Sequence, residues 1–263
     1  MLPSQRRQAV LRRLTAHGEV GFNELAEEFG VSEMTIRRDL ETLEADGLAR
    51  RVRGGAISVV SRSYEPPLAV RATTASAAKA AIGTAAASLV NEGDTVIIDV
   101  GTTTLELARA LHGRRGLTVV TASLPIAVEL GGDPDIRVIV TGGQVRSGEL
   151  SLTGGITEDV FGALNCDLAF IGVAGICATP GLTEYNQDDA RVKRAAIAAA
   201  RRSVVLADSS KLGRVAFATV APLSAIDAVV TDAPGSQQAA SELAAAGAEV
   251  IEAKVDDVAD ENP

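Results

Sequence analysis

The sequence lacks tryptophan, and aromatic residues make up only 3 % of its 263 residues. The hydrophobic core must therefore consist of Ala, Val, Leu and Ile, a composition typical of a parallel sheet covered by helices. The only two cysteines, Cys166 and Cys177, have no metal or redox spacing, and we expect them to be buried packing residues. No apolar run is long enough to span a membrane, and residues 1–14 are too charged for a signal peptide. We expect a cytoplasmic protein with no membrane contact, no bound metal and no cofactor.

The formal net charge of −9 is distributed unevenly. Residues 1–57 contain nine arginines and nine acidic residues, so the remaining chain carries the whole net charge. An acidic body repels DNA at long range. Any contact with DNA must therefore come from arginines placed locally in the first segment.

The first segment has the pattern of three helices and a hairpin. Apolar spacing predicts a helix over 5–15, and residues 19–21 form a short extended piece. Asn23 is a candidate N-cap for a second helix that stops at Gly30, and Ser32 is a candidate N-cap for a third. Because the third helix starts a few residues after the second, the spacing predicts a helix-turn-helix.

The third helix has distinct faces. Ile36, Leu40 and Leu43 form an apolar stripe that packs inward, and the side opposite it forms the candidate DNA-reading face. Arg38 there could read guanine and Met34 could touch a thymine methyl group. The full set of candidate DNA contacts consists of Ser32, Met34, Thr35, Arg37, Arg38, Arg50, Arg51 and Arg53.

Residues 48–57 read as a small basic hairpin that follows the third helix, as a wing would. Its arginines, with Arg37, would contact the DNA backbone and position the domain without reading sequence. The alternative is a three-helix scaffold in which the arginines pair with Glu41, Glu44 and Asp46.

The rest of the chain alternates between helical and strand-like patterns. We expect a winged helix-turn-helix domain at 1–57, a linker at 58–75, an α/β domain at 76–252 and an acidic tail at 253–263. Expected strands cover residues 95–98, 117–120, 136–140, 168–171, 204–207 and 228–230. Expected helices cover 76–90, 105–111, 188–202 and 237–246. The pattern predicts a parallel sheet with helices on both faces.

Polar residues follow the carboxyl ends of these strands, where open α/β sheets bind ligands. After the first strand, residues 99–104 read Asp-Val-Gly-Thr-Thr-Thr and open a helix whose first amides could hold a phosphate. The alternative is an ordinary turn with a threonine N-cap. Gly142-Gly143 is a second candidate loop or a simple turn, and Lys211 is the best candidate cation.

Two sets of residues resemble the DeoR family of bacterial repressors. The first is the run 31–40, Val-Ser-Glu-Met-Thr-Ile-Arg-Arg-Asp-Leu, with Leu43, Gly47 and 53–56. The second comprises Arg71, Lys79, 99–104, 142–146, 167–172, Gly181, Lys193 and 208–211. The resemblance implies a winged helix that binds operator repeats as a homodimer or homotetramer. It also implies a Rossmann-like sensor domain related to ribose-5-phosphate isomerase and glucosamine-6-phosphate deaminase.

The resemblance places an effector site in the second domain. The candidate effector-binding residues are Lys79, Asp99, Gly101, Thr102, Thr103, Thr104, Gly142, Gly143, Asp167, Lys193, Asp208 and Lys211. The chain departs from the family pattern at Ala122, where Asn is usual, at Gly155, where Pro is common, and at Asp189, where Glu is usual. Loss of the Asn side chain points to a different effector.

We expect a repressor of a sugar-catabolism operon, controlled by a phosphorylated sugar or a related metabolite, with no catalytic residues. The alternative is an isomerase or deaminase with an attached DNA-binding domain, using Asp99, Asp167 or Asp208 as acid or base. The only histidines, His17 and His112, lie in the first domain and at a helix end. A third reading is a DNA-binding protein whose acidic body recruits a protein partner and does not respond to small phosphates.

Overall fold

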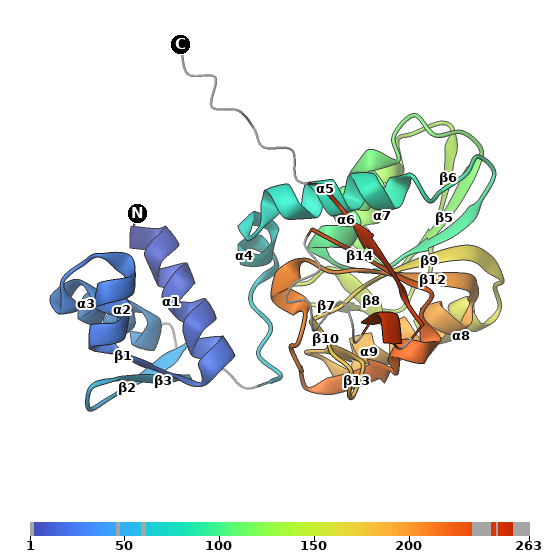
Figure 1. Ribbon diagram of the computed structural model, residues 1–263. Helices are drawn as coiled ribbons and strands as arrows, with labels where there is room; N and C mark the ends of the chain where they lie inside the picture. The colour runs from blue at the N-terminus through green and yellow to red at the C-terminus, as the bar shows by residue number, and fades with distance from the viewer. Residues whose placement is uncertain (1–2, 46–47, 59–61, 233–242, 246, 255–263) are drawn as a thin grey trace, which may run out of the picture. The chain divides into compact units, whose positions relative to one another are not determined.

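The computed structural model describes residues 3–45, 48–58, 62–232, 243–245 and 247–254 (Figure 1). The chain divides into two compact units, Met1–Tyr64 and Glu65–Pro263. The division falls inside the segment 58–75 that was expected to be a linker. Residues 65–75 pack with the larger unit and include the short helix α4 (Leu68–Thr73).

The smaller unit is a winged helix-turn-helix. Its elements are α1 (Pro3–His17), β1 (Glu19–Gly21), α2 (Phe22–Phe29), α3 (Glu33–Ala45), β2 (Ala49–Val52) and β3 (Gly55–Ser58). Leu14 of α1, Leu25 of α2 and Ile36 of α3 meet in one buried core. The three strands form an antiparallel sheet in the order β1-β3-β2, in which β2 and β3 are the hairpin expected from the sequence.

Two glycines allow the turn and the hairpin to form. Gly30 ends α2 with a φ of +61°, in the left-handed region that favours glycine. Gly55 lies against β1 so closely that a Cβ atom would come within 1.9 Å of the carbonyl oxygen of Val20. The second helix was expected to be capped by Asn23, and this is wrong. α2 begins at Phe22 with Gly21 at its N-cap, so Asn23 lies inside the first turn.

The larger unit is a seven-stranded parallel sheet in the order β15-β14-β12-β9-β4-β5-β6. Its strands are β4 (Thr95–Ile98), β5 (Leu117–Thr121), β6 (Ile136–Val140), β9 (Cys166–Gly172), β12 (Ala200–Leu206), β14 (Ala228–Thr231) and β15 (Glu249–Glu252). The helices are α5 (Ser76–Ala87), α6 (Thr102–Ala110), α7 (Leu124–Leu130), α8 (Gly155–Gly162) and α9 (Gln187–Ala198), with 3-10 turns η1 (Ser209–Lys211) and η2 (Leu223–Ala225). Two small antiparallel sheets flank it, one of β7 (Gln144–Arg146) and β8 (Ser151–Thr153), the other of β10 (Gly175–Ile176), β11 (Leu182–Glu184) and β13 (Ala218–Ala221).

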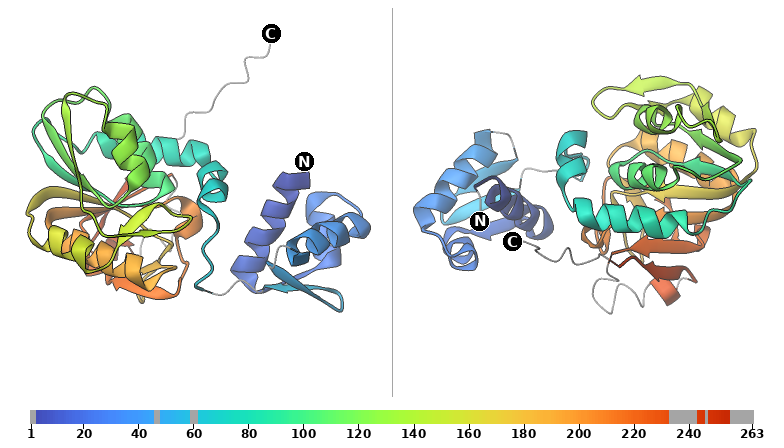
Figure 2. Two further views of the ribbon diagram at one scale, coloured as in Figure 1. Left: turned by 180° about the vertical axis from the view of Figure 1, so that it is seen from behind. Right: turned by 90° about the horizontal axis from the view of Figure 1, so that it is seen from above.

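Helices cover both faces of the large sheet, as the apolar strands predicted (Figures 1 and 2). Ile82 of α5, Leu107 of α6 and Ile126 of α7 pack on one face. Phe161 of α8 and Val192 of α9 pack on the other. The direction of sheet growth reverses between β4 and β9, because the chain lays β5 and β6 beside β4 and later places β12, β14 and β15 beside β9. Such a switch point is where open α/β sheets bind ligands.

Several expected boundaries differ from the structure. The helix expected to run to Arg202 ends at Ala198, and Ala200 already belongs to β12. α6 begins at Thr102, three residues before the expected start, because Gly101 already occupies its N-cap. Most of the expected helix at 237–246 and of the expected tail at 253–263 lies outside the described residues.

Candidate functional site

The outward face of α3 has the arrangement expected of a recognition helix. Ser32 caps the helix, since the backbone N–H of Thr35 donates to the Ser32 hydroxyl at 3.3 Å. Ile36 and Leu40 are fully buried, whereas Met34 is 59 % exposed. The assignment of faces is therefore confirmed, and the DNA contacts themselves remain predictions.

The basic residues around α3 differ in their partners. Arg38, Arg50 and Arg53 are exposed and form no ion pair with any described residue. Arg37 lies over the ring of Phe22, 4.1 Å from its centroid, and 3.5 Å from Glu33.

Arg51 of the wing has two carboxylate partners on α3. Its side chain contacts Glu41 at 2.7 Å and Glu44 at 2.7 Å, as the alternative interpretation proposed, while Asp46 lies outside the described residues. Arg51 therefore fastens the wing to the helix, and a phosphate contact would have to compete with these ion pairs.

An ion pair that the sequence did not reveal holds α3 against α1. Arg6 Nε lies 2.5 Å from the carboxylate of Asp39, and both side chains are buried. Asp39 follows the two arginines at 37 and 38, so the pair fixes the helix rotation that turns those arginines outward.

Two substitutions should separate sequence reading from general DNA affinity. Arg38→Ala should relax base preference at one position of the site, at a cost of about 1–3 kcal/mol on the preferred sequence. Arg50→Ala should weaken binding to all sequences alike and reduce the salt slope by about 1. Binding of preferred and scrambled duplexes, measured by fluorescence anisotropy at several salt concentrations, checks both. Equal loss of specificity in both variants would contradict the assignment.

A cavity of about 300 Å³ lies within the larger unit. It opens at the switch point, since the loop after β4 supplies Val100 and Gly101 and the loop after β9 supplies Val173 and Ala174. Helices α4, α5, α6 and α9 and the turn η1 also contribute to its wall.

The N-terminus of α6 faces this cavity. Gly101 is its N-cap, with a φ of +148°, and no side chain caps the helix. A threonine N-cap was the alternative, but the Thr104 hydroxyl instead donates to the carbonyl oxygen of Gly101 at 3.0 Å. Thr102 and Thr103 line the cavity. The N–H groups of the first helical turn are therefore available to an anion.

Lys79 and Lys211 line the same cavity. Among the described residues neither ammonium group has a carboxylate within ion-pair distance, and the Lys79 Nζ donates to the backbone carbonyl of Arg71. Burial lowers the pKa of Lys79 to about 8, an effect that nearby Asp208 opposes. Burial also lowers the pKa of Lys211. A buried lysine and a half-buried lysine, each without a carboxylate at ion-pair distance, lie beside an uncapped helix N-terminus, and this combination of charge and donors suits a phosphate.

Lys193 behaves differently, because carboxylates already surround it. Its Nζ donates to Asp99 and lies 3.3 Å from Glu184, and its side chain is 2 % exposed. Burial opposes its charge, but Asp99 and Glu184 outweigh burial and raise its pKa. Asp99 also accepts the backbone N–H of Gly172 at 3.0 Å, so it ties β4 to the end of β9.

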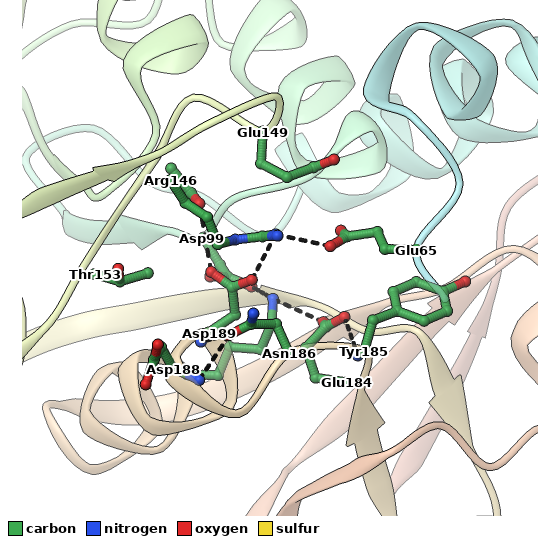
Figure 3. A network of polar contacts seen from close by, with 12 residues as sticks. Glu65, Asp99, Arg146, Glu149, Thr153, Glu184, Tyr185, Asn186, Asp188 and Asp189 are labelled. Atoms are coloured by element: carbon green, nitrogen blue, oxygen red, sulfur yellow. Dashed lines mark hydrogen bonds and ion pairs between the residues drawn. The ribbon is translucent and has the colours of Figure 1, made fainter. Parts of the chain in front are cut away.

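A network of ion pairs forms another part of the cavity wall (Figure 3). Arg146 contacts Glu65 at 2.8 Å and Asp189 at 2.6 Å. Arg71 contacts Glu65 at 3.0 Å and also pairs with Glu149. Burial raises the pKa of Asp189 to about 6, although Lys193 and Arg146 oppose this shift. Burial likewise raises the pKa of Glu65, against Arg71 and Arg146.

The structure brings together half of the effector residues expected from the sequence. Those lining the cavity are Lys79, Gly101, Thr102, Thr103, Lys193 and Lys211. Asp99 and Thr104 lie just behind this wall through their contacts with Lys193 and Gly101. Asp208 caps η1, where its carboxylate accepts the backbone N–H of Ser210 at 3.0 Å.

Three expected residues lie elsewhere. Asp167 stands at the amino end of β9, where it accepts the backbone N–H of Thr95 at 3.0 Å, so its assignment to the pocket is wrong. Gly142 and Gly143 form a turn packed on α8, where Thr157 donates to the Gly142 carbonyl at 2.7 Å. A Cβ atom at Gly143 would meet the Thr157 hydroxyl at 2.2 Å, so close packing accounts for this glycine.

Comparison with known proteins agrees with this arrangement. A family model for the DeoR-like helix-turn-helix domain matches residues 6–62, and a model for the DeoR C terminal sensor domain matches residues 74–233. The chain belongs to the DeoR family. It is a DNA-binding transcriptional regulator. Glu65 and Arg71, which line the cavity, lie between the two matched ranges.

Curated relatives match over nearly their full length. The HTH-type transcriptional regulator YgbI of Escherichia coli K12 is 39 % identical over 88 % of this chain and 91 % of that protein. The glycerol-3-phosphate regulon repressor of the same strain is 36 % identical over 89 % of this chain and 92 % of that protein. Among solved structures, ribose 5-phosphate isomerase A from Methanocaldococcus jannaschii is similar with a TM-score of 0.38 and 18 % identity, over 54 % of each chain.

The departures from the DeoR pattern have distinct positions. Ala122 is 1 % exposed and packs in the core, while Gly155 begins α8 at an exposed position. Asp189 lies in the first turn of α9, where Asn186 caps the helix, and its carboxylate reaches Arg146.

Within the described residues, no helix is long and apolar enough to cross a membrane and no group of side chains is arranged to hold a metal ion.

Proposed function

We propose that this regulator is a repressor whose binding to operator DNA is controlled by a phosphorylated sugar or a related metabolite held in the cavity at the switch point. The observation that carries the proposal is the uncapped N-terminus of α6 beside Lys79 and Lys211. The named function of one relative, repression of a glycerol-3-phosphate regulon, agrees with a phosphate ester as the controlling compound.

The site favours a switch over isomerase or deaminase chemistry at the three carboxylates named from the sequence. Asp99 is tied to Lys193, Asp167 to Thr95 and Asp208 to Ser210, so none of the three candidate carboxylates faces the cavity as a base. His112 contacts Glu129 and Asp133 away from the cavity wall. A non-catalytic role is therefore part of the proposal.

The proposed mechanism is a shift between conformers. A homodimer or homotetramer sets two or more recognition helices at operator spacing. The ligand joins α6, α5 and η1, because the two lysines and the threonines come from these three elements. To alter DNA binding it must favour one conformer by about 1–3 kcal/mol.

The test is a DNA-binding assay on duplexes selected by the protein itself. Phosphorylated sugars should change the affinity for DNA, whereas the same sugars without phosphate should not. Lys211→Met should bind DNA normally and lose the response, since it loses a charge-assisted contact of about 1.5–3 kcal/mol. Lys254→Met, at an exposed position, is the control. An equal response to unphosphorylated sugars, or turnover of a sugar phosphate, would contradict the proposal.

A further inference from the structure

Two buried polar atoms in the larger unit lack a hydrogen-bond partner. Over the described residues, these unpaired side-chain atoms are Arg146 Nε and Tyr185 Oη. Both residues line the candidate effector cavity, and Tyr185 is only 4 % exposed. A buried donor without a partner costs about 1–3 kcal/mol. Two such donors in one cavity wall favour a ligand that brings hydrogen-bond acceptors.

The ion pairs around these two donors contain more carboxylates than cations. Two sets of ion pairs together hold five carboxylates and three cations. In one set Arg71 and Arg146 contact Glu65, Glu149 and Asp189, and in the other Lys193 contacts Asp99 and Glu184. Figure 3 shows Arg146 joined to Glu65 and Asp189, which come from separate elements of the fold. We name the part of the wall formed by Glu65, Glu184, Tyr185, Asp189 and Arg146 the carboxylate end.

Resting on the proposed function for the phosphate, we propose that the carboxylate end selects a ligand whose unphosphorylated end carries neutral hydroxyl groups and rejects one that ends in a second acid. A hydroxyl both accepts and donates a hydrogen bond. It can therefore accept from Arg146 Nε while it donates to Asp189, which lies beside Arg146. A carboxylate can only accept, so it satisfies the donors but adds a like charge to the cluster.

The ion pairs and the burial of the carboxylate end support this preference for neutral hydroxyl groups. Arg71, Arg146 and Lys193 each already contact at least one carboxylate, so none of these three offers an unpaired positive charge to a second acid. The raised pKa of Asp189, about 6, shows that burial already disfavours the charge that is present there. Lys79 and Lys211, which have no carboxylate at ion-pair distance among the described residues, lie beside the proposed phosphate site, where the first anionic group of the ligand binds.

The experiment uses matched pairs of ligands that differ only at the end opposite the phosphate. Glycerol 3-phosphate is paired with 3-phosphoglycerate, erythritol 4-phosphate with 4-phosphoerythronate, and glucitol 6-phosphate with 6-phosphogluconate. Binding to the full chain is measured by calorimetry. In every pair that binds, the polyol phosphate should bind at least about tenfold more tightly than the acid.

Substitutions test whether the residues of the carboxylate end cause the preference for the polyol phosphate. Asp189→Asn and Glu65→Gln each remove one negative charge, and they should narrow the preference by increasing the affinity for the acid member. Tyr185→Phe should lower the affinity for the polyol phosphate about five- to tenfold and leave inorganic phosphate binding unchanged. Thermal unfolding of each variant checks that it folds, and Lys254→Met serves again as the unaffected control.

The outcomes separate this inference from the proposed function. Equal or tighter binding of the acid member in any pair that binds overturns the selectivity, and so does an unchanged preference in both charge-removing variants. Absence of binding by all pairs and by inorganic phosphate overturns the phosphate site itself, and the selectivity with it.

Discussion

Replacing Lys193 with methionine should lower the free energy of unfolding of the larger unit by about 3–5 kcal/mol. The substitution leaves Asp99 and Glu184 buried and without their shared cation, 2 % and 7 % exposed respectively. For a unit of this size the loss corresponds to a fall in melting temperature of about 6–20 °C. Circular dichroism during thermal and urea unfolding measures it, and hydrogen exchange in α9 shows which unit is affected.

The pH dependence of the stability of Lys193→Met shows whether the unpaired carboxylates cause the loss. Burial raises the pKa of Asp99 even with Lys193 present, and removal of the lysine raises it further. A carboxylate whose folded pKa exceeds its unfolded value destabilises the fold at high pH, so Lys193→Met should regain stability as the pH falls towards 5. The double variant Asp99→Asn, Lys193→Met should recover part of the loss at pH 7, and Lys254→Met should lose nothing. A loss that is the same at pH 5 and pH 8 would point to a packing defect.

Six of the seven strands of the large sheet and the helix-turn-helix could be predicted because their signals are local. Apolar runs mark β4, β5, β6, β9, β12 and β14, and the positions of Ser32 and Gly30 mark the helix ends. The strands that were not predicted include three of the shortest ones. β7 and β8 have three residues each and β10 has two, which is too short for a periodic pattern. Their pairing is decided by tertiary contacts.

The candidate effector site was likewise predictable from the sequence only in part. The loop at 99–104 could be predicted because one short segment contains the strand end, the glycine and the helix start. The carboxylate end could not be predicted, because Glu65, Arg146, Glu184 and Asp189 come from four separate segments that only the fold brings together. Glu184 offered no local signal, because it ends a three-residue strand with a single apolar side chain.

Asp167 shows how the sheet-edge argument can fail. Polar residues at the carboxyl ends of β4 and β12 do lie at or just behind the cavity, as expected for an open parallel sheet. Asp167 instead precedes the apolar core of β9, so it belongs to the opposite edge, where it binds Thr95. A residue at a strand end must therefore be assigned to one edge from the chain direction before it is assigned to a site.

Raising the pH from 7 to 9.5 should weaken binding of a phosphorylated effector by at least about tenfold. Because burial lowers the pKa of Lys79 to about 8, the free protein loses this charge at a pH where ordinary lysines keep it. A bound phosphate raises that pKa, so the affinity is highest below pH 8 and falls as the pH rises through it. The phosphate has its second pKa near 6 and is already a dianion, so the ligand does not titrate in this range. Calorimetry across the pH series measures the slope.

Two variants of Lys79 distinguish this charge from other causes of the pH dependence. Lys79→Arg keeps a positive charge at every pH tested, so its slope should be shallower than that of the wild-type protein. The remaining slope belongs to Lys211, whose pKa burial also lowers. Lys79→Met should bind about 10–100-fold more weakly at pH 7, and it should also show the shallower slope because the titrating group is gone. If Lys79→Arg retained the full wild-type slope, the titrating group would have to be another residue. The phosphate contact would then rest on Lys211 and the amides of α6 alone.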